Sequence, residues 1–271
     1  MRPLNFSDNL LRIAPFLVGA AAGVFFYRER RERLALERLG AATLESLLDA
    51  IDANNAETGA HVRRVADYAL ALARAADLDE RQQRSVERIA LFHDIGKIDG
   101  AISDIVNDTK RLTRRERDAV MTHPRKGAEV LEPLAAFYPD LPKGVLAHHE
   151  RWDGTGYPRK LQGETIPIEA RVVAIADTFD AVTQSRPYSH ARTLESAVRI
   201  VANGRGTQFD PDLVDLFLSP PVIEYVGRSM RKAHSPRRAH GKRRRNHASA
   251  GVPDIIFRWR TPSPVQRQAG R

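Results

Sequence analysis

The chain of 271 residues contains no cysteine. This absence excludes disulfide bonds, thiolate metal sites and cysteine nucleophiles, so any metal must be held by nitrogen and oxygen ligands. The sequence also lacks any alternating apolar and polar segment of the length of a useful strand. Helical spacing of apolar residues recurs instead, which predicts a mainly α-helical protein.

Positive charge is unevenly distributed, although the formal net charge of the whole chain is +9. From residue 227 to the C-terminus, thirteen Lys and Arg face one acidic residue, Asp254, and residues 1–38 carry a further net +3. Residues 39–226 therefore carry a net −6, which excludes a body that coats nucleic acid through its net charge. We expect residues 220–271 to form a basic, disordered tail, which either has no partner or contacts anionic lipid or nucleic acid.

Long apolar runs are also missing, since the longest one covers only residues 13–27. As a helix this run spans about 22 Å, against about 30 Å for the hydrocarbon core of a bilayer. Two interpretations stay open for residues 1–27. They anchor the protein to the inner membrane, with the following Arg-rich segment in the cytoplasm, or they form an apolar helix that packs on protein.

Helical periodicity predicts the domain organisation. Residues 28–53 carry leucines at steps of three to five residues, which predicts a continuous helical linker and a short seam for a homodimer. Residues 54–219 hold a series of about seven helical patterns. One of them covers residues 113–137 and begins with the capping-box residues Thr113 and Glu116. The expected fold is therefore all-α: a helical bundle with an N-terminal helical extension and a disordered C-terminal tail.

Histidines and carboxylates near helix ends, or on otherwise apolar helices, form the main candidate site. A lone buried His or Asp usually has a structural partner, but eight such residues on successive helices predict a metal cluster. The adjacent pairs His93–Asp94 and His148–His149 project about 100° apart on a helix, which suits more than one ion. Ligands without sulfur favour manganese, iron or zinc over magnesium or calcium. The candidates are Glu57, His61, His93, Asp94, His123, His148, His149 and Asp177.

Several motifs in this region resemble a known family. HDIGK at residues 93–97 and HHERWDGTGYP at residues 148–158 are similar to the HD-GYP subgroup of the HD-domain metal-dependent phosphohydrolases. The resemblance continues through IPIEARVVAIADTFDAVTQSRPY and GTQFDP and covers residues 54–217. One short motif is weak evidence, but this many motifs in order, with helical spacing, are specific.

The resemblance implies a cytoplasmic catalytic domain that hydrolyses cyclic di-GMP to pGpG, with GMP as a further candidate product. A water activated by two or three divalent ions, iron or manganese, would attack the phosphorus. The eight candidates correspond to metal ligands, with Glu57 as the glutamate of family members that hold a third ion. Asp94 and Lys97 correspond to catalytic residues. The implied substrate contacts are Lys97, Arg186, Gly156, Tyr157 and Pro158.

Two alternatives to cyclic di-GMP hydrolysis stay open. One is hydrolysis of another nucleotide, such as a cyclic GMP-AMP dinucleotide. The other is a catalytically weak cyclic di-GMP sensor or scaffold that acts by protein contact at the GYP loop. The second is kept open because Asp108, Thr109 and Lys110 replace the family's Lys-Pro-Gly pattern, and Ser189 stands where a basic residue is common.

Overall fold

The computed structural model describes residues 6–98, 100, 102, 105, 112–184 and 192–234. Side chains are described from residue 25 onward within these ranges, except those of residues 33, 34 and 54. Residues 1–234 form one compact unit, and the second unit, residues 235–271, lies wholly outside the described part. The predictions for Arg186, Ser189, residues 108–110 and the tail beyond residue 234 also fall outside it.

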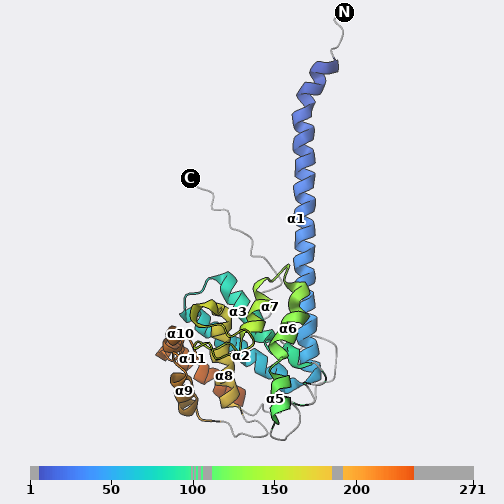
Figure 1. The fold of residues 1–271 in the computed structure, drawn as a ribbon. Coiled ribbons are helices and arrows are strands. Elements are labelled where there is room, and N and C mark those ends of the chain that lie inside the picture. Colours follow the sequence, from blue (N-terminus) through green and yellow to red (C-terminus); the bar gives the residue numbers. More distant parts are fainter. Residues whose placement is uncertain are drawn as a thin grey trace, which may run out of the picture. The chain divides into compact units, whose positions relative to one another are not determined.

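The described part of the chain is built from helices, with no strand beyond one isolated bridge, so the all-α prediction is confirmed (Figure 1). The α-helices are α1 (Phe6–Asn54), α2 (Ala56–Ala75), α3 (Glu80–Phe92), α5 (Arg114–Val120), α6 (His123–Leu131), α7 (Asp140–Ala147), α8 (Ile168–Thr183), α9 (Leu194–Asn203), α10 (Pro211–Phe217) and α11 (Pro220–His234). Short 3-10 helices are η1 (Ile95–Ile98), η2 (Glu132–Leu134) and η3 (Gly163–Thr165).

Helices α2, α3 and α8 pack together at the centre of the bundle (Figure 1). Apolar side chains that recur at helical spacing are removed from water there, among them Val65, Leu72, Ile89 and Val173, each 0% exposed. Helices α6 and α7 pack on each other, and α6 also packs on η1. The histidine-bearing ends of α3, α6 and α7 are therefore fixed by a packed core.

The N-terminal helix α1 contains both the predicted apolar segment and the predicted linker in one continuous helix. Its last turns bury Leu44, Leu48 and Ile51, whereas Leu36 and Leu39 are 49% and 61% exposed. No helix within the described residues has the length and apolar character needed to cross a membrane.

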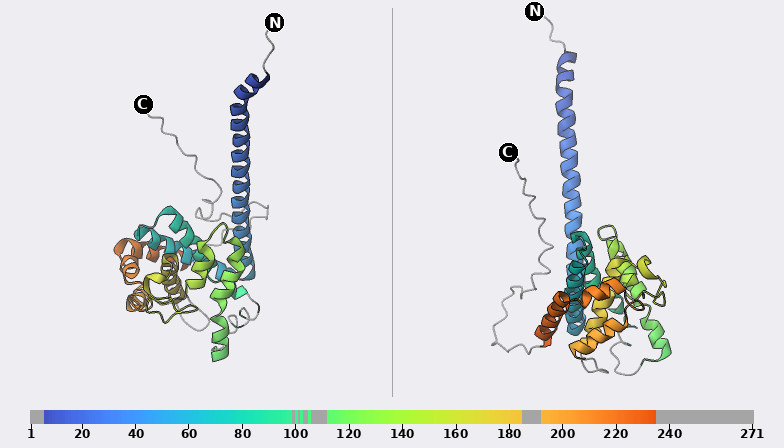
Figure 2. Two further views of the ribbon diagram at one scale, coloured as in Figure 1. Left: turned by 45° about the horizontal axis from the view of Figure 1, so that its top comes forward. Right: turned by 90° about the vertical axis from the view of Figure 1, so that its left-hand side faces the viewer.

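Helix α11 corrects the prediction that the chain is disordered from residue 220 onward, which is wrong for residues 220–234. Val222 and Val226 lie four residues apart and are buried, because one apolar face of α11 packs on the domain. The hydroxyls of Tyr225 and Ser229 both donate to the Asp67 carboxylate of α2, at 2.5 Å each. Figure 2 shows α11 (orange) beside α2 from two further directions.

The single helix predicted over residues 113–137 is also wrong, because the chain forms α5, α6 and η2 there. The capping box of Thr113 and Glu116 is present at the start of α5. Pro124 in the first turn of α6 lacks a backbone N–H and cannot continue the preceding helix. The break places His123 at the beginning of α6, where its side chain is 1% exposed.

Candidate metal centre

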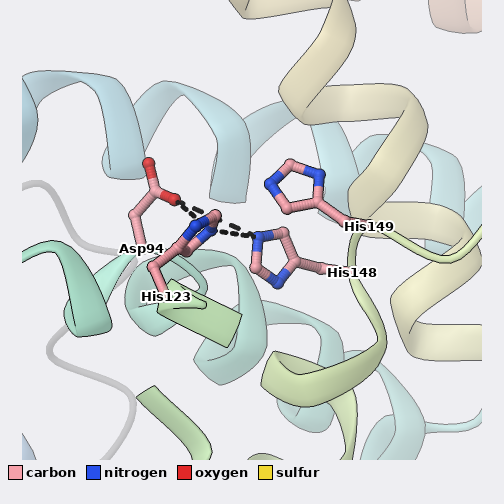
Figure 3. Close-up of side chains that lie close together, drawn as sticks. All are labelled: Asp94, His123, His148 and His149. Atoms are coloured by element: carbon pink, nitrogen blue, oxygen red, sulfur yellow. Dashed lines mark hydrogen bonds and ion pairs between the residues drawn. The ribbon is translucent and has the colours of Figure 1, made fainter. Parts of the chain in front are cut away.

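Among the described residues, two groups of side chains could hold a metal ion, and within each group the ligand atoms lie within 4.8 Å of one another. One group contains Asp94, His123, His148 and His149, and Figure 3 shows the rings of His123 and His148 beside the Asp94 carboxylate. The other group contains His61, His93 and Asp177. Seven of the eight predicted ligands therefore come together from five segments: α2, the end of α3, α6, the end of α7 and α8.

Asp94 lies between the two groups and joins them. Its Oδ1 atom is 3.3 Å from His123 Nε2 and 4.0 Å from His148 Nε2. Its Oδ2 atom is 3.5 Å from His93 Nε2 and 4.0 Å from His61 Nε2. A carboxylate in this position can offer one oxygen to an ion on each side.

Helix ends orient three of the histidines. The Nδ1–H groups of His93, His123 and His148 donate to carbonyls three residues earlier, at 2.8, 2.7 and 2.6 Å. Carbonyls in the last turn of a helix have no partner within the helix, so an imidazole N–H can satisfy them. This bond fixes the tautomer and leaves the Nε2 lone pair facing the cluster, as metal coordination requires.

Two buried atoms support the fit of a divalent cation to these residues. His93 Nε2 and Asp94 Oδ1 are buried without a hydrogen-bond partner. An unpaired buried polar atom costs about 1–3 kcal/mol, so a ligand is expected for them. In addition, the Nε2 atoms of His123 and His148 face each other at 3.2 Å, although both would carry lone pairs. A cation in each of the two groups would give all four atoms a partner.

The ligands also have the protonation states that a metal needs. Burial opposes ionisation of Asp94, but the charge of the adjacent Lys97 ammonium holds the pKa of Asp94 well below its usual range. Burial lowers the pKa of His149 to about 4 and also lowers that of His148. At neutral pH, Asp94 is therefore anionic and the two histidines are neutral.

His61 differs, and it makes metal binding depend on pH. Burial lowers its pKa, but hydrogen bonds and charges of Asp177 and Asp180 outweigh burial and raise the pKa to about 9. Below that pH a metal must displace a proton from the ring. We therefore expect the affinity of metal-free protein for Mn²⁺ to rise about tenfold per pH unit between pH 6.5 and 8.5.

This pH dependence is measured by Mn²⁺ titration together with proton release in weak buffer. Release of about one proton per chain at pH 7.5 is expected. An affinity that does not change over this pH range would contradict the proton displacement.

Of the other predicted site residues that the structure describes, Lys97 and Tyr157 contact members of the cluster. Lys97 Nζ lies 2.6 Å from Asp94 Oδ2. The ring of Tyr157 stacks on that of His149, with centroids 4.9 Å apart. Gly156 lets this loop pass close to the backbone of Arg151, since a Cβ at Gly156 would lie 2.4 Å from the backbone nitrogen of Arg151. Pro158 follows in the same loop.

Glu57 is not part of either group. Its side chain is exposed in the first turn of α2, one helical turn before His61. Its role as a ligand for a third ion stays a prediction.

Sequence reasoning missed Asp180 and Arg64. The buried Asp180 carboxylate accepts hydrogen bonds from His61 Nδ1 and from Arg64. A signal was present, because His61 and Arg64 are three residues apart, as are Asp177 and Asp180. Such pairs share one helical face, and α2 packs on α8.

An all-helical bundle that gathers histidines and aspartates from successive helices defines a metal-binding domain of the HD class. The chain belongs to this family, since the HD domain family model matches residues 45–213.

Curated relatives show the same likeness. The chain is 39% identical over 192 residues to the cyclic di-GMP phosphodiesterase response regulator RpfG of Xanthomonas campestris, an alignment that covers 70% of this chain and 48% of that protein. It is 38% identical over 175 residues to the 3'3'-cGAMP-specific phosphodiesterase 2 of Vibrio cholerae, covering 64% of this chain and 33% of the relative. The chain thus spans less than half the length of these two relatives.

A solved structure supports the fold. The HD domain of the L. monocytogenes phosphodiesterase PgpH, in complex with cyclic-di-AMP, aligns with a TM-score of 0.51 and 18% identity. The alignment covers 71% of this chain and 98% of that domain.

Proposed function

We propose that the chain is a metal-dependent phosphodiesterase of the HD-GYP subgroup that hydrolyses cyclic di-GMP to pGpG, with GMP as a further candidate product. The observation that carries this proposal is the Asp94 carboxylate between two groups of imidazole Nε2 atoms, with Lys97 beside it. Relatives named as cyclic di-GMP phosphodiesterases support the substrate class.

Two or three divalent ions, iron or manganese, would be held by the two groups and by Glu57. When bound, they would polarise phosphoryl oxygens and lower the pKa of a bound water. The chain's own residues supply position and charge. The side chain of Lys97 is 30% exposed and its ammonium is held against Asp94, so it can reach a phosphate that enters the cluster. Arg186 is proposed as a second phosphate contact.

The GYP loop is proposed to contact the substrate. Tyr157 N–H donates to the His149 carbonyl at 3.2 Å, and its ring lies against the His149 ring. The buried Glu150 carboxylate accepts the backbone N–H groups of Arg159 and Leu161, which fixes the chain just after Pro158. Gly156, Tyr157 and Pro158 are therefore held in one place beside the metal ligands, as a substrate contact requires.

The proposal is tested with the purified full chain, loaded anaerobically with Mn²⁺ or Fe²⁺ and given cyclic di-GMP. Appearance of pGpG, followed by chromatography, is expected. Absence of any product under these conditions contradicts the enzyme. Tight nucleotide binding without turnover would instead favour the sensor or scaffold.

Hydrolysis of a cyclic GMP-AMP dinucleotide is the second candidate, because relatives at 38% and 35% identity are named 3'3'-cGAMP-specific phosphodiesterases. A substrate panel separates the two candidates. The proposed function requires faster turnover of cyclic di-GMP than of 3'3'-cGAMP and cyclic-di-AMP, at equal concentration and metal content.

The third ion gives a separate prediction for Glu57. We expect Glu57→Gln to lower the bound metal by about one ion per chain while keeping the fold, because only an exposed side chain changes. Metal content by mass spectrometry and circular dichroism measure both effects. Glu80→Gln is the matched control, since Glu80 is also a first-turn glutamate, with a side chain 89% exposed. Equal metal content in both variants would exclude Glu57 as a ligand.

Four further proposals come from the sequence alone. They are a homodimer through the linker, residues 28–53, a protein partner at the GYP loop, contact of the tail with anionic lipid or nucleic acid, and a cytoplasmic domain anchored to the inner membrane.

A further inference from the structure

Asp180 lies in the last turns of α8 with a side chain only 1% exposed, and two groups from α2 occupy its carboxylate. Oδ2 accepts from His61 Nδ1 at 2.7 Å and from Arg64 Nη2 at 2.9 Å. Oδ1 accepts from Arg64 Nε at 2.7 Å. The guanidinium binds both oxygens, which is the geometry of a strong, oriented ion pair.

His61 needs such a partner because it lies within α2 rather than at a helix end. His93, His123 and His148 use carbonyls of terminal helical turns as Nδ1 partners. Carbonyls inside a helix already accept the helix's own N–H groups, so α2 offers His61 no free carbonyl. The orientation of His61 therefore depends on a side chain of another helix.

We propose that Asp180, held by Arg64, is a positioning residue that sets the metal affinity of the His61, His93 and Asp177 group. Its effect on turnover rests on the proposed function. A carboxylate on Nδ1 fixes the imidazole tautomer and makes Nε2 a stronger ligand. His61 Nε2 is directed toward Asp177, 3.4 Å away.

Arg64 also explains why Asp180 acts indirectly while Asp177 is a ligand. Both oxygens of Asp180 are taken by hydrogen bonds, and the guanidinium neutralises its charge within the core. Asp177 is 19% exposed and has Oδ1 beside two imidazole Nε2 atoms. Two carboxylates three residues apart on α8 thus have different tasks.

The inference predicts a selective effect. The Nδ1 atoms of His123 and His148 are held by backbone carbonyls, which do not change when Asp180 is substituted. Asp180→Asn keeps the volume but removes the charge. We expect it to weaken the binding of one Mn²⁺ ion about 10- to 100-fold, because the loss of the oriented, more basic imidazole outweighs the easier loss of the His61 proton. The binding of the other ion is expected to stay within about twofold.

The test is a titration of the full chain with Mn²⁺ alone, in which free Mn²⁺ is followed by electron paramagnetic resonance. The matched control is Asp210→Asn, because Asp210 is also a buried carboxylate, 2.6 Å from Arg171, outside both ligand groups. The control is expected to bind both ions like the unmodified protein. The inference would be overturned if Asp180→Asn lowered the affinity for both ions equally, or lowered it no more than the control does.

A second variant keeps the test decisive if Asp180→Asn does not fold. Arg64→Lys keeps a cation but loses the two-pronged contact, so Asp180 is held less firmly. We expect a smaller loss of Mn²⁺ affinity than in Asp180→Asn, confined to the same ion. Unchanged affinity would contradict the role of Arg64. These affinities are measured without turnover.

The two proposals can therefore fail separately. A protein that binds Mn²⁺ as expected but makes no pGpG contradicts the proposed function alone. An active enzyme whose Mn²⁺ affinity is unchanged in both variants contradicts this inference alone.

Discussion

Asp94→Asn is expected to lower the rate of the proposed cyclic di-GMP hydrolysis by about a thousandfold or more. Asp94 is the residue whose two oxygens face opposite ligand groups, so the substitution weakens both groups at once. It also releases Lys97 from its 2.6 Å contact with Oδ2. The measurements are initial rates of pGpG formation and metal content by mass spectrometry, and bound metal should fall together with the rate.

The control for this prediction is Asp215→Asn. Asp215 is an exposed carboxylate that pairs with Arg205 at 2.7 Å, outside both ligand groups. Exposed ion pairs contribute about 0–1 kcal/mol, so activity and metal content should stay within about twofold of the unmodified protein. If Asp94→Asn retained more than about a tenth of the activity, Asp94 would not link the two groups.

Gly96→Ala is expected to lower the free energy of unfolding by about 4 kcal/mol or more, or to prevent folding. A Cβ at this position would lie 2.1 Å from the carbonyl oxygen of His123 and 2.6 Å from the backbone nitrogen of Gly127. Both atoms belong to the backbone of α6 and cannot rotate away as a side chain would. Relief of the clash moves η1 away from α6, which separates Asp94 from His123.

Urea unfolding followed by circular dichroism measures this loss, and metal content of the folded fraction measures the displacement. Gly100→Ala is the matched control, since Gly100 is exposed and a Cβ there would meet no atom within 4 Å. The free energy of unfolding of Gly100→Ala should stay within about 0.5 kcal/mol of that of the unmodified protein. A Gly96→Ala protein within about 1 kcal/mol of the unmodified stability would show that η1 and α6 are not tightly packed.

The fold class was predictable because helices are encoded locally. Apolar residues at steps of three and four define the buried faces of α2, α3 and α8, and capping residues such as Asp79 and Thr113 mark helix starts. The ligand types were predictable for a different reason. Histidine and aspartate on apolar helices are costly unless they have partners, so their number pointed to a cluster.

Local patterns failed where packing decides the outcome. The basic composition after residue 220 predicts disorder, but Val222 and Val226 gain enough from burial for α11 to form. The helical pattern over residues 113–137 does not show that α5 ends at Val120 and that His123 begins a new helix with its side chain buried.

The sequence by itself therefore determined an all-α chain with an acidic body and eight candidate nitrogen and oxygen ligands. Only the tertiary structure decided that Asp94 lies between two groups, that Asp180 holds His61, and that Glu57 stands outside both groups. These relations join residues far apart in the chain, such as His61 and Asp180, which are separated by 119 positions. They depend on how α2 and α8 pack side chain against side chain. The spacing of residues along one helix shows which side chains share a face, but not which face of another helix they meet.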